Sequence, residues 1–203
     1  GIQVNQADNK GWTPLRYACR YGHLKVVDML LAVDGIQVNQ AYNKYWPGTP
    51  LSFACGEGHS KVVEMLLAVD GIKVNQANES GWTPLKAACT WGHLKVVEML
   101  LAVDGIQVNQ ATNFGRTPLN AACSNGHSKV VKMLLAWDGI QVNQATNKGT
   151  TPLNVACSND HSKVVEMLLA MDGIQVNQAN DKEATPLTVL DPCQVFCVIL
   201  DPY

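Results

Sequence analysis

The sequence predicts an all-α solenoid of helix-turn-helix units, joined by long loops that form β-turn fingers. The phrase GIQVNQA, or GIKVNQA, occurs six times, with spacings of 34, 36, 34, 34 and 34 residues: it begins at Gly1, Gly35, Gly71, Gly105, Gly139 and Gly173. The triplet Thr-Pro-Leu also occurs once in each copy, and two short apolar stripes of helical period follow it. A period in this range is the signature of a repeat array.

The chain divides into five full units and a partial one, numbered one to six here: 1–34, 35–70, 71–104, 105–138, 139–172 and 173–190. The array is therefore predicted over 1–190. Unit two is longer because NKGWTPL in unit one becomes NKYWPGTPL. Residues 191–203 form a divergent C-terminal tail or cap, because Asp191-Pro192 interrupts any helix there. The tail either folds over the last repeat, which is favoured, or is the stub of a longer array.

Unit one shows the plan of every unit. Thr13 suits an N-cap, and Pro14 suits the first helical position, where no N–H is needed. The first helix then carries a stripe that we expect to be buried: Leu15, Ala18 and Cys19. Gly22 tolerates the positive φ at the end of that helix. A second helix follows, with one apolar face: Val26, Val27, Leu30 and Leu31.

Charge and hydropathy exclude several classes of protein. The formal net charge is -2, so no basic field is available for general binding of nucleic acid. The longest apolar stretch is VFCVIL at 195–200, far shorter than the ~20 residues that span a bilayer. No N-terminal signal pattern is present, although the chain begins at Gly1 without Met. We expect a cytoplasmic or nuclear monomer.

The cysteines and histidines form ladders rather than reactive pairs. Five cysteines share one repeat position, and equivalent helices stack ~8–10 Å apart, too far for disulfides: Cys19, Cys55, Cys89, Cys123 and Cys157. We expect them to be small buried side chains. Five histidines share another position, where we expect hydrogen bonding in the turn between helices: His23, His59, His93, His127 and His161.

Neither ladder predicts catalysis or a bound metal. A catalytic group usually occurs once, with its own orienting partner, whereas these residues occur five times in near-identical settings. Cys193 and Cys197 lie four apart in the tail, but no further metal ligands stand nearby. The sequence also lacks a glycine-rich phosphate loop, a paired-carboxylate site and a nucleophile elbow. We therefore expect no enzyme activity, no cofactor and no metal.

Three recurring motifs carry a family resemblance. Thr-Pro-Leu stands at 13–15, 49–51, 83–85, 117–119, 151–153 and 185–187. Gly-His stands at 22–23, 58–59, 92–93 and 126–127, and as Asp160-His161 in unit five, while Val-Asn occurs in all six units. These residues resemble the ankyrin repeat, whose signature is T-P-L-H-x-A with a period near 33. The resemblance covers nearly the whole chain, to about Leu190.

The chain departs from the ankyrin pattern in two ways. The histidine after Thr-Pro-Leu is replaced in every unit, by Arg16, Ser52, Lys86, Asn120, Asn154 and Thr188. The loop AVDGIQVN is also one residue longer than the common form. We expect both departures to alter hydrogen bonding in the loops and to leave the fold intact.

The candidate binding residues stand where the copies differ: at the loop tips, at the end of the first helix and after Thr-Pro-Leu. On a helical wheel, positions 16, 17, 20 and 21 lie opposite the buried stripe. The resemblance implies that these zones line a concave groove that binds protein partners. Trp, Tyr and Arg dominate binding energies. We therefore predict these contacts: Trp12, Arg16, Arg20, Tyr21, Tyr45, Trp46, Glu57, Trp82, Lys86, Trp91, Phe114 and Arg116.

The alternative is that some of these aromatic side chains only pack against neighbouring repeats. We favour packing for Tyr17 and Phe53, because their position stays apolar in the other units. The predicted function is that of a non-enzymatic scaffold or adaptor that binds a protein or peptide, with no nucleic acid and no membrane insertion. Two other interpretations stay open: a regulatory or substrate-recruiting arm of a larger enzyme (a kinase, ubiquitin ligase or effector), and a structural spacer without a groove partner.

Overall fold

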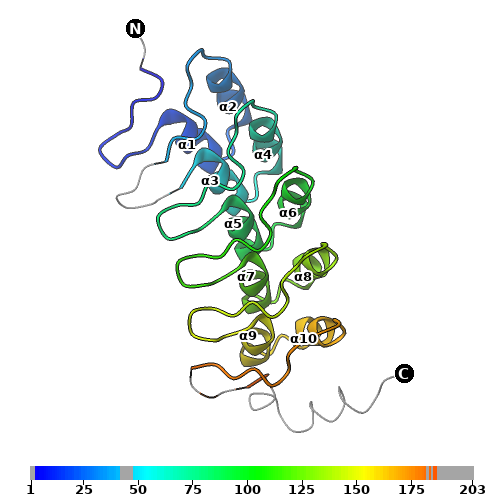
Figure 1. Ribbon diagram of the computed structural model, residues 1–203. Coiled ribbons are helices and arrows are strands. Elements are labelled where there is room, and N and C mark those ends of the chain that lie inside the picture. The colour runs from blue at the N-terminus through cyan, green and yellow to red at the C-terminus, as the bar shows by residue number, and fades with distance from the viewer. Residues whose placement is uncertain (1–2, 42–47, 182, 184, 187–203) are drawn as a thin grey trace.

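The computed structural model describes residues 3–41, 48–181, 183 and 185–186. Over these residues it is a stack of five helix pairs without strands, as predicted. The helices are α1 (Pro14–Arg20), α2 (Leu24–Leu31), α3 (Pro50–Gly56), α4 (Ser60–Leu67), α5 (Pro84–Trp91), α6 (Leu94–Leu101), α7 (Pro118–Ser124), α8 (Ser128–Leu135), α9 (Pro152–Ser158) and α10 (Ser162–Leu169). The odd-numbered helices form one layer and the even-numbered helices a second, and long fingers project beyond the first layer (Figure 1).

Each first helix begins as the Thr-Pro pattern predicts. The Thr13 hydroxyl accepts a hydrogen bond from the Arg16 backbone N–H at 3.3 Å, and the equivalent threonine caps each other first helix. In α7 the cap is reciprocal, because the Asn120 side chain accepts from the Thr117 backbone N–H at 2.9 Å. The residue after Thr-Pro-Leu therefore contributes to helix capping where it is asparagine.

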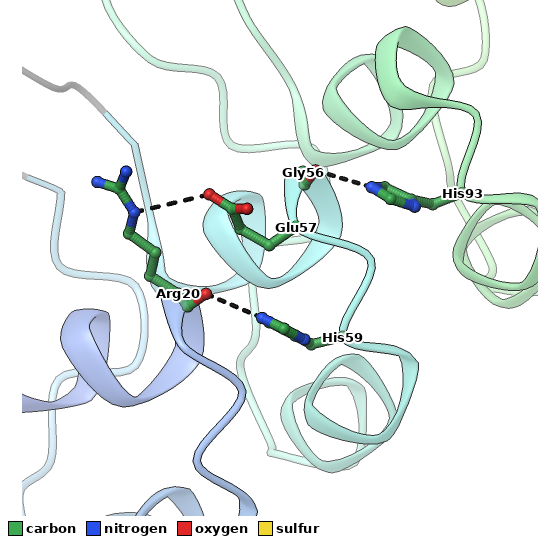
Figure 2. Close-up of polar contacts among 5 residues, drawn as sticks. All are labelled: Arg20, Gly56, Glu57, His59 and His93. Carbon is green, nitrogen blue, oxygen red and sulfur yellow. Dashed lines mark hydrogen bonds and ion pairs between the residues drawn. The ribbon is translucent and has the colours of Figure 1, made fainter.

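The histidine ladder bonds neighbouring units together. The His59 Nε2 lies 2.9 Å from the carbonyl of Arg20, and the His93 Nε2 lies 2.9 Å from the carbonyl of Gly56 (Figure 2). Because a carbonyl only accepts, each ring donates from Nε2. The same contact joins His127 to Thr90 and His161 to Ser124. The prediction of hydrogen bonding between helices is confirmed, and its target is the end of the preceding first helix.

An asparagine ladder holds the other end of each unit. Asn39 donates its side-chain N–H to the carbonyl of Gly71 at 2.8 Å and accepts from the backbone N–H of Lys73 at 2.9 Å. Equivalent pairs of bonds start at Asn5, Asn75, Asn109 and Asn143. The Val-Asn motif thus sets the turn of the next unit, a role that the repeat pattern alone did not reveal.

The core lies between the two layers and runs continuously along the stack. All five ladder cysteines are buried free thiols, as predicted, and burial raises the pKa of the Cys19 thiol to about 12. Burial of the second helices depends on their neighbours: Val96 in unit three is 1% exposed, whereas its equivalent Val26 in unit one is 45% exposed. Unit three has a described unit on each side, so its apolar face is covered completely.

Candidate functional site

A cavity of about 670 Å³ opens between units two and three, on the side of the first helices. Phe53 and Gly56 of α3 line it, together with Ala87 and Trp91 of α5. Trp82, in the finger that leads into α5, closes another part of the wall. The cavity exists because two wall positions carry small residues: unit one has Arg20 where unit two has Gly56, and unit two has Phe53 where unit three has Ala87.

The equivalent space between units one and two is filled. The Trp12 ring packs 4.9 Å from the Phe53 ring, centroid to centroid, and the Arg16 guanidinium lies 4.5 Å from the Trp12 centroid. The Arg20 guanidinium lies 5.1 Å from the same ring. Arg16 also donates from Nη1 to the carbonyl of Gly11 at 2.7 Å. This cluster leaves no room for a partner's side chain.

The filled junction corrects two of the predicted contacts. Trp12 is 5% exposed and Arg16 is 1% exposed, so the expectation that their side chains reach a partner is wrong. The helical wheel placed Arg16 opposite the buried stripe of its own helix. It could not show that the finger and the next unit cover that side. Tyr17 and Phe53, assigned to packing, do contact Trp12, with ring centroids at 5.1 and 4.9 Å.

Lys86 is a third correction, because its side chain is 2% exposed. Its Nζ lies 3.1 Å from the centroid of the Trp82 ring, a cation–π contact. Burial, the main cause, and the positive charge of Arg116 in unit four together lower the pKa of the Lys86 ammonium to about 8. Among the described residues, no carboxylate forms an ion pair with either Lys86 or Arg116. The two cations of units three and four therefore act on each other, and neither is paired with a carboxylate of the described residues.

Other predicted residues do lie at the surface. Trp91 is 64% exposed, Phe114 is 68% exposed and Tyr21 is 57% exposed, while Arg116 is exposed and Trp82 is half-buried. Arg20 and Glu57 form an ion pair at 3.6 Å across units one and two (Figure 2). Because both side chains remain partly in solvent, this pair contributes little to stability. Tyr45 and Trp46 lie outside the described residues.

Comparison with known protein families identifies the family of this chain. The sequence model described as "Ankyrin repeats (3 copies)" matches residues 1–42, 37–112 and 103–180. The chain belongs to the ankyrin-repeat family. Ankyrin repeats are generally protein-binding modules and typically not catalytic. A comparison with curated proteins found no match.

In this ankyrin-repeat array, the cavity is lined by four of the predicted contacts and shaped by two small residues that were not predicted. Gly56 and Ala87 were not singled out, because both are small and neither carries a binding group. Phe53 was assigned to packing alone, although it also lines the cavity. The signal was present in the alignment of the copies: a position that holds Tyr17 and Phe53 becomes Ala87 in the next unit. A large-to-small change between neighbouring copies leaves space.

The ladder cysteines are buried thiols rather than thiolates. Burial raises the pKa of the Cys157 thiol to about 11 and raises that of Cys55 further, so these thiols stay protonated at neutral pH. In the part of the chain that the structure describes, no three His, Cys, Asp or Glu side chains are grouped to hold a metal ion. None of the described helices combines the length and the apolar character that crossing a membrane requires.

Proposed function

We propose that the array is a scaffold or adaptor module whose partner, a protein or peptide, docks on the first-helix side at units two to four. The observation that carries the proposal is the cavity, with three aromatic walls: Phe53, Trp82 and Trp91. Its volume lies within the range of side-chain and ligand pockets. Trp91 adds an exposed ring at the rim, and exposed tryptophans of this kind are typical anchors of protein interfaces.

A standard interface buries ~800 Å² on each partner, so we expect the partner to contact residues beyond the cavity. Phe114 and Arg116 extend the exposed contacts into unit four, and Glu57 extends them towards unit one. Units one and five offer fewer exposed tryptophan side chains. Trp12 is covered in unit one, and unit five carries Thr150 and Asn159 where unit three carries Trp82 and Trp91.

The test compares two substitutions at one repeat position. Trp91 and Asn159 occupy equivalent places at the ends of α5 and α9, and both are exposed. A partner captured by proximity labelling in the native host is titrated against Trp91→Ala and Asn159→Ala. We expect Trp91→Ala to cost at least ~2 kcal/mol of binding, roughly thirtyfold in affinity, and Asn159→Ala to cost little. Equal losses in two folded variants would show that the cavity rim is not the site.

A third variant tests the cavity itself. Ala87→Phe restores the large side chain that Phe53 provides in unit two, and it fills the cavity from its wall. We expect it to weaken binding as strongly as Trp91→Ala. The matched control is Val155→Phe, the same repeat position in unit five, which lies away from the cavity. Circular dichroism and urea melts establish that both variants are folded.

A further inference from the structure

The overall net charge of -2 hides a separation of charge between the two sides of the array. In units one to five, the described part of the fingers and first helices, up to the histidine, carries six Lys or Arg residues and four acids. The second helices and the turns that follow them carry seven Lys residues and nine acids. The first-helix side is therefore net positive and the second-helix side net negative. Two of the six cations, Arg16 and Lys86, are buried, so the four cations at the surface equal the four acids in number and the buried charges supply the excess.

The acids on the first-helix side of units one and two are already engaged. Asp8 accepts hydrogen bonds from the backbone N–H groups of Lys10 and Trp12 and from the Tyr17 hydroxyl, all at 2.8 to 2.9 Å. Glu57 pairs with Arg20 at 3.6 Å. Against these two acids, units one and two carry three described cations on this side, and the buried one, Arg16, stacks on Trp12 and donates to the Gly11 carbonyl.

Units three and four carry Lys86 and Arg116 on this side against a single acid, Glu79, and among the described residues no ion pair joins Glu79 to either cation. The Lys86 ammonium is buried under the Trp82 finger, where water screens a charge poorly, so its field extends to the nearby surface. Arg116 is exposed in the adjoining finger, and its charge acts on Lys86. Trp82 connects this pair to the cavity, because its ring both lines the cavity and contacts Lys86. A positive site and an apolar site thus lie beside each other.

We propose that the partner segment is acidic: one of its carboxylates pairs with Arg116 and neutralises the buried charge of Lys86, while a neighbouring apolar side chain enters the cavity. This inference rests on the proposed function and specifies the chemistry of its partner. The carboxylate does not need to touch Lys86, since the buried ammonium attracts it through a medium of low dielectric constant. Charge complementarity of this kind also selects against basic segments, which the two cations repel.

The experiment uses a phage-displayed library of random linear peptides, selected on the purified chain. We expect the enriched peptides to carry Asp or Glu next to an aromatic or aliphatic residue. One enriched peptide is then synthesised in its acidic form and with that acid changed to the amide. Both peptides are titrated against the unsubstituted chain, Arg116→Gln, Lys86→Met and Lys129→Gln. Lys129 is exposed in α8 on the acidic side, so its substitution removes the same charge away from the site.

The acidic peptide should lose about tenfold in affinity to Arg116→Gln and a similar factor to Lys86→Met, as expected for a charged hydrogen bond or close charge pair. The amide peptide should barely distinguish these variants, which gives a positive coupling in the double-mutant cycle. Lys129→Gln should bind both peptides like the unsubstituted chain. Arg116 is exposed, so its substitution leaves the core intact and keeps the test decisive.

Two failures have different meanings. Enriched peptides that lack acids, or whose affinity ignores Lys86 and Arg116 but falls with Trp91→Ala, overturn the acidic partner and leave the proposed function standing. Selection that enriches no peptide, or peptides whose affinity is indifferent to Trp91→Ala and Ala87→Phe, overturns the proposed docking site and the acidic partner with it.

Discussion

The junction between units one and two differs from the junction between units two and three in how the same repeat positions are used. At the first junction, Arg20 and Phe53 fill the space over Trp12, which is left 5% exposed. At the second junction, the equivalent residues are Gly56 and Ala87, and a cavity of about 670 Å³ remains. One junction is packed, and the other is open.

This difference shows that the burial of a residue depends on the side chains of the next unit as much as on those of its own unit. Trp12 and Trp82 precede the capping threonine in units one and three, so a single-copy analysis gives them the same role. Trp12 meets Phe53 from unit two and becomes core. The residue of unit four that corresponds to Phe53 is Ala121, and Trp82 stays half-buried and lines the cavity.

The largest expected effect tests whether Trp12 is core and Trp91 is surface. Trp12→Ala should lower the free energy of unfolding by about 3 to 5 kcal/mol, because it removes a buried ring and leaves Arg16 and Phe53 without their partner. Trp91→Ala should change it by only about 0.5 kcal/mol, since this ring is 64% exposed. Urea melts of both variants measure the contrast, and comparable losses would contradict the assignment of the two junctions.

The sequence was enough to predict the fold because every copy carries the same local signals for the start, the end and the buried face of its helices. Thr13-Pro14 fixes the start of a helix, Gly22 fixes its end at a φ of 68°, and the apolar stripes fix the layers. The partial sixth copy was predicted from Thr185-Pro186-Leu187, of which the structure describes the first two residues. The tail with its possible cap lies outside the described residues and stays a prediction.

The site was harder to predict because its shape depends on contacts between copies. The helical wheel describes one helix, so it assigned Arg16 and Lys86 to an open face, whereas the fingers cover both. Residue type was also a poor guide, since Gly56 and Ala87 shape the cavity because neither has a large side chain. Comparing neighbouring copies position by position would have indicated both the packed junction and the open one.

The second prediction compares the two buried cations at one repeat position. Lys86→Met should raise the free energy of unfolding at pH 7 by on the order of 2 to 3 kcal/mol, because it removes a buried charge without a carboxylate partner and keeps the stem. Arg16→Met should instead lower it by about 1 to 2 kcal/mol, since Arg16 donates to the Gly11 carbonyl and stacks on Trp12.

The pH dependence of Lys86 gives this prediction a sign. Burial lowers the pKa of its ammonium from 10.5 to about 8, with Arg116 and Cys89 as the nearby titratable groups. Between these values the unfolded chain holds a proton that the folded chain has released, so stability rises with pH in this window. The buried ladder thiols have raised pKa values and lower stability near the top of this range, so the Lys86 contribution is measured as a difference between two chains. In urea melts from pH 7 to pH 10, the free energy of unfolding of the unsubstituted chain should rise relative to that of Lys86→Met. A difference between the two chains that does not change with pH would contradict the assignment to Lys86.

A smaller effect is expected at the histidine bond of the packed junction. Gly22 has a φ of 68°, and a Cβ added there would lie 2.7 Å from the His59 Nδ1. Gly22→Ala should therefore lower the free energy of unfolding by about 1 to 2 kcal/mol through backbone strain, and displace the His59 ring from the Arg20 carbonyl. Asp160, with a φ of 55°, occupies this position in unit five, and the sequence has Val195, in the tail, where a following histidine would stand.

The smallest expected effect, of opposite sign, lies at Gly56 in the open junction. Gly56 is helical, and a Cβ there would lie 3.7 Å from the Ala87 Cβ and 3.9 Å from the Trp91 Cδ1, both ordinary contacts. Gly56→Ala should raise the free energy of unfolding by about 0.5 to 1 kcal/mol, because alanine loses less backbone entropy in a helix than glycine. The added methyl group also narrows the cavity, so stability should rise while affinity for a peptide selected on the chain falls. If Gly56→Ala instead leaves affinity unchanged, the cavity is not where the apolar side chain of the peptide binds. If it destabilises the chain as Gly22→Ala does, the two junctions are packed alike and the comparison between them is wrong.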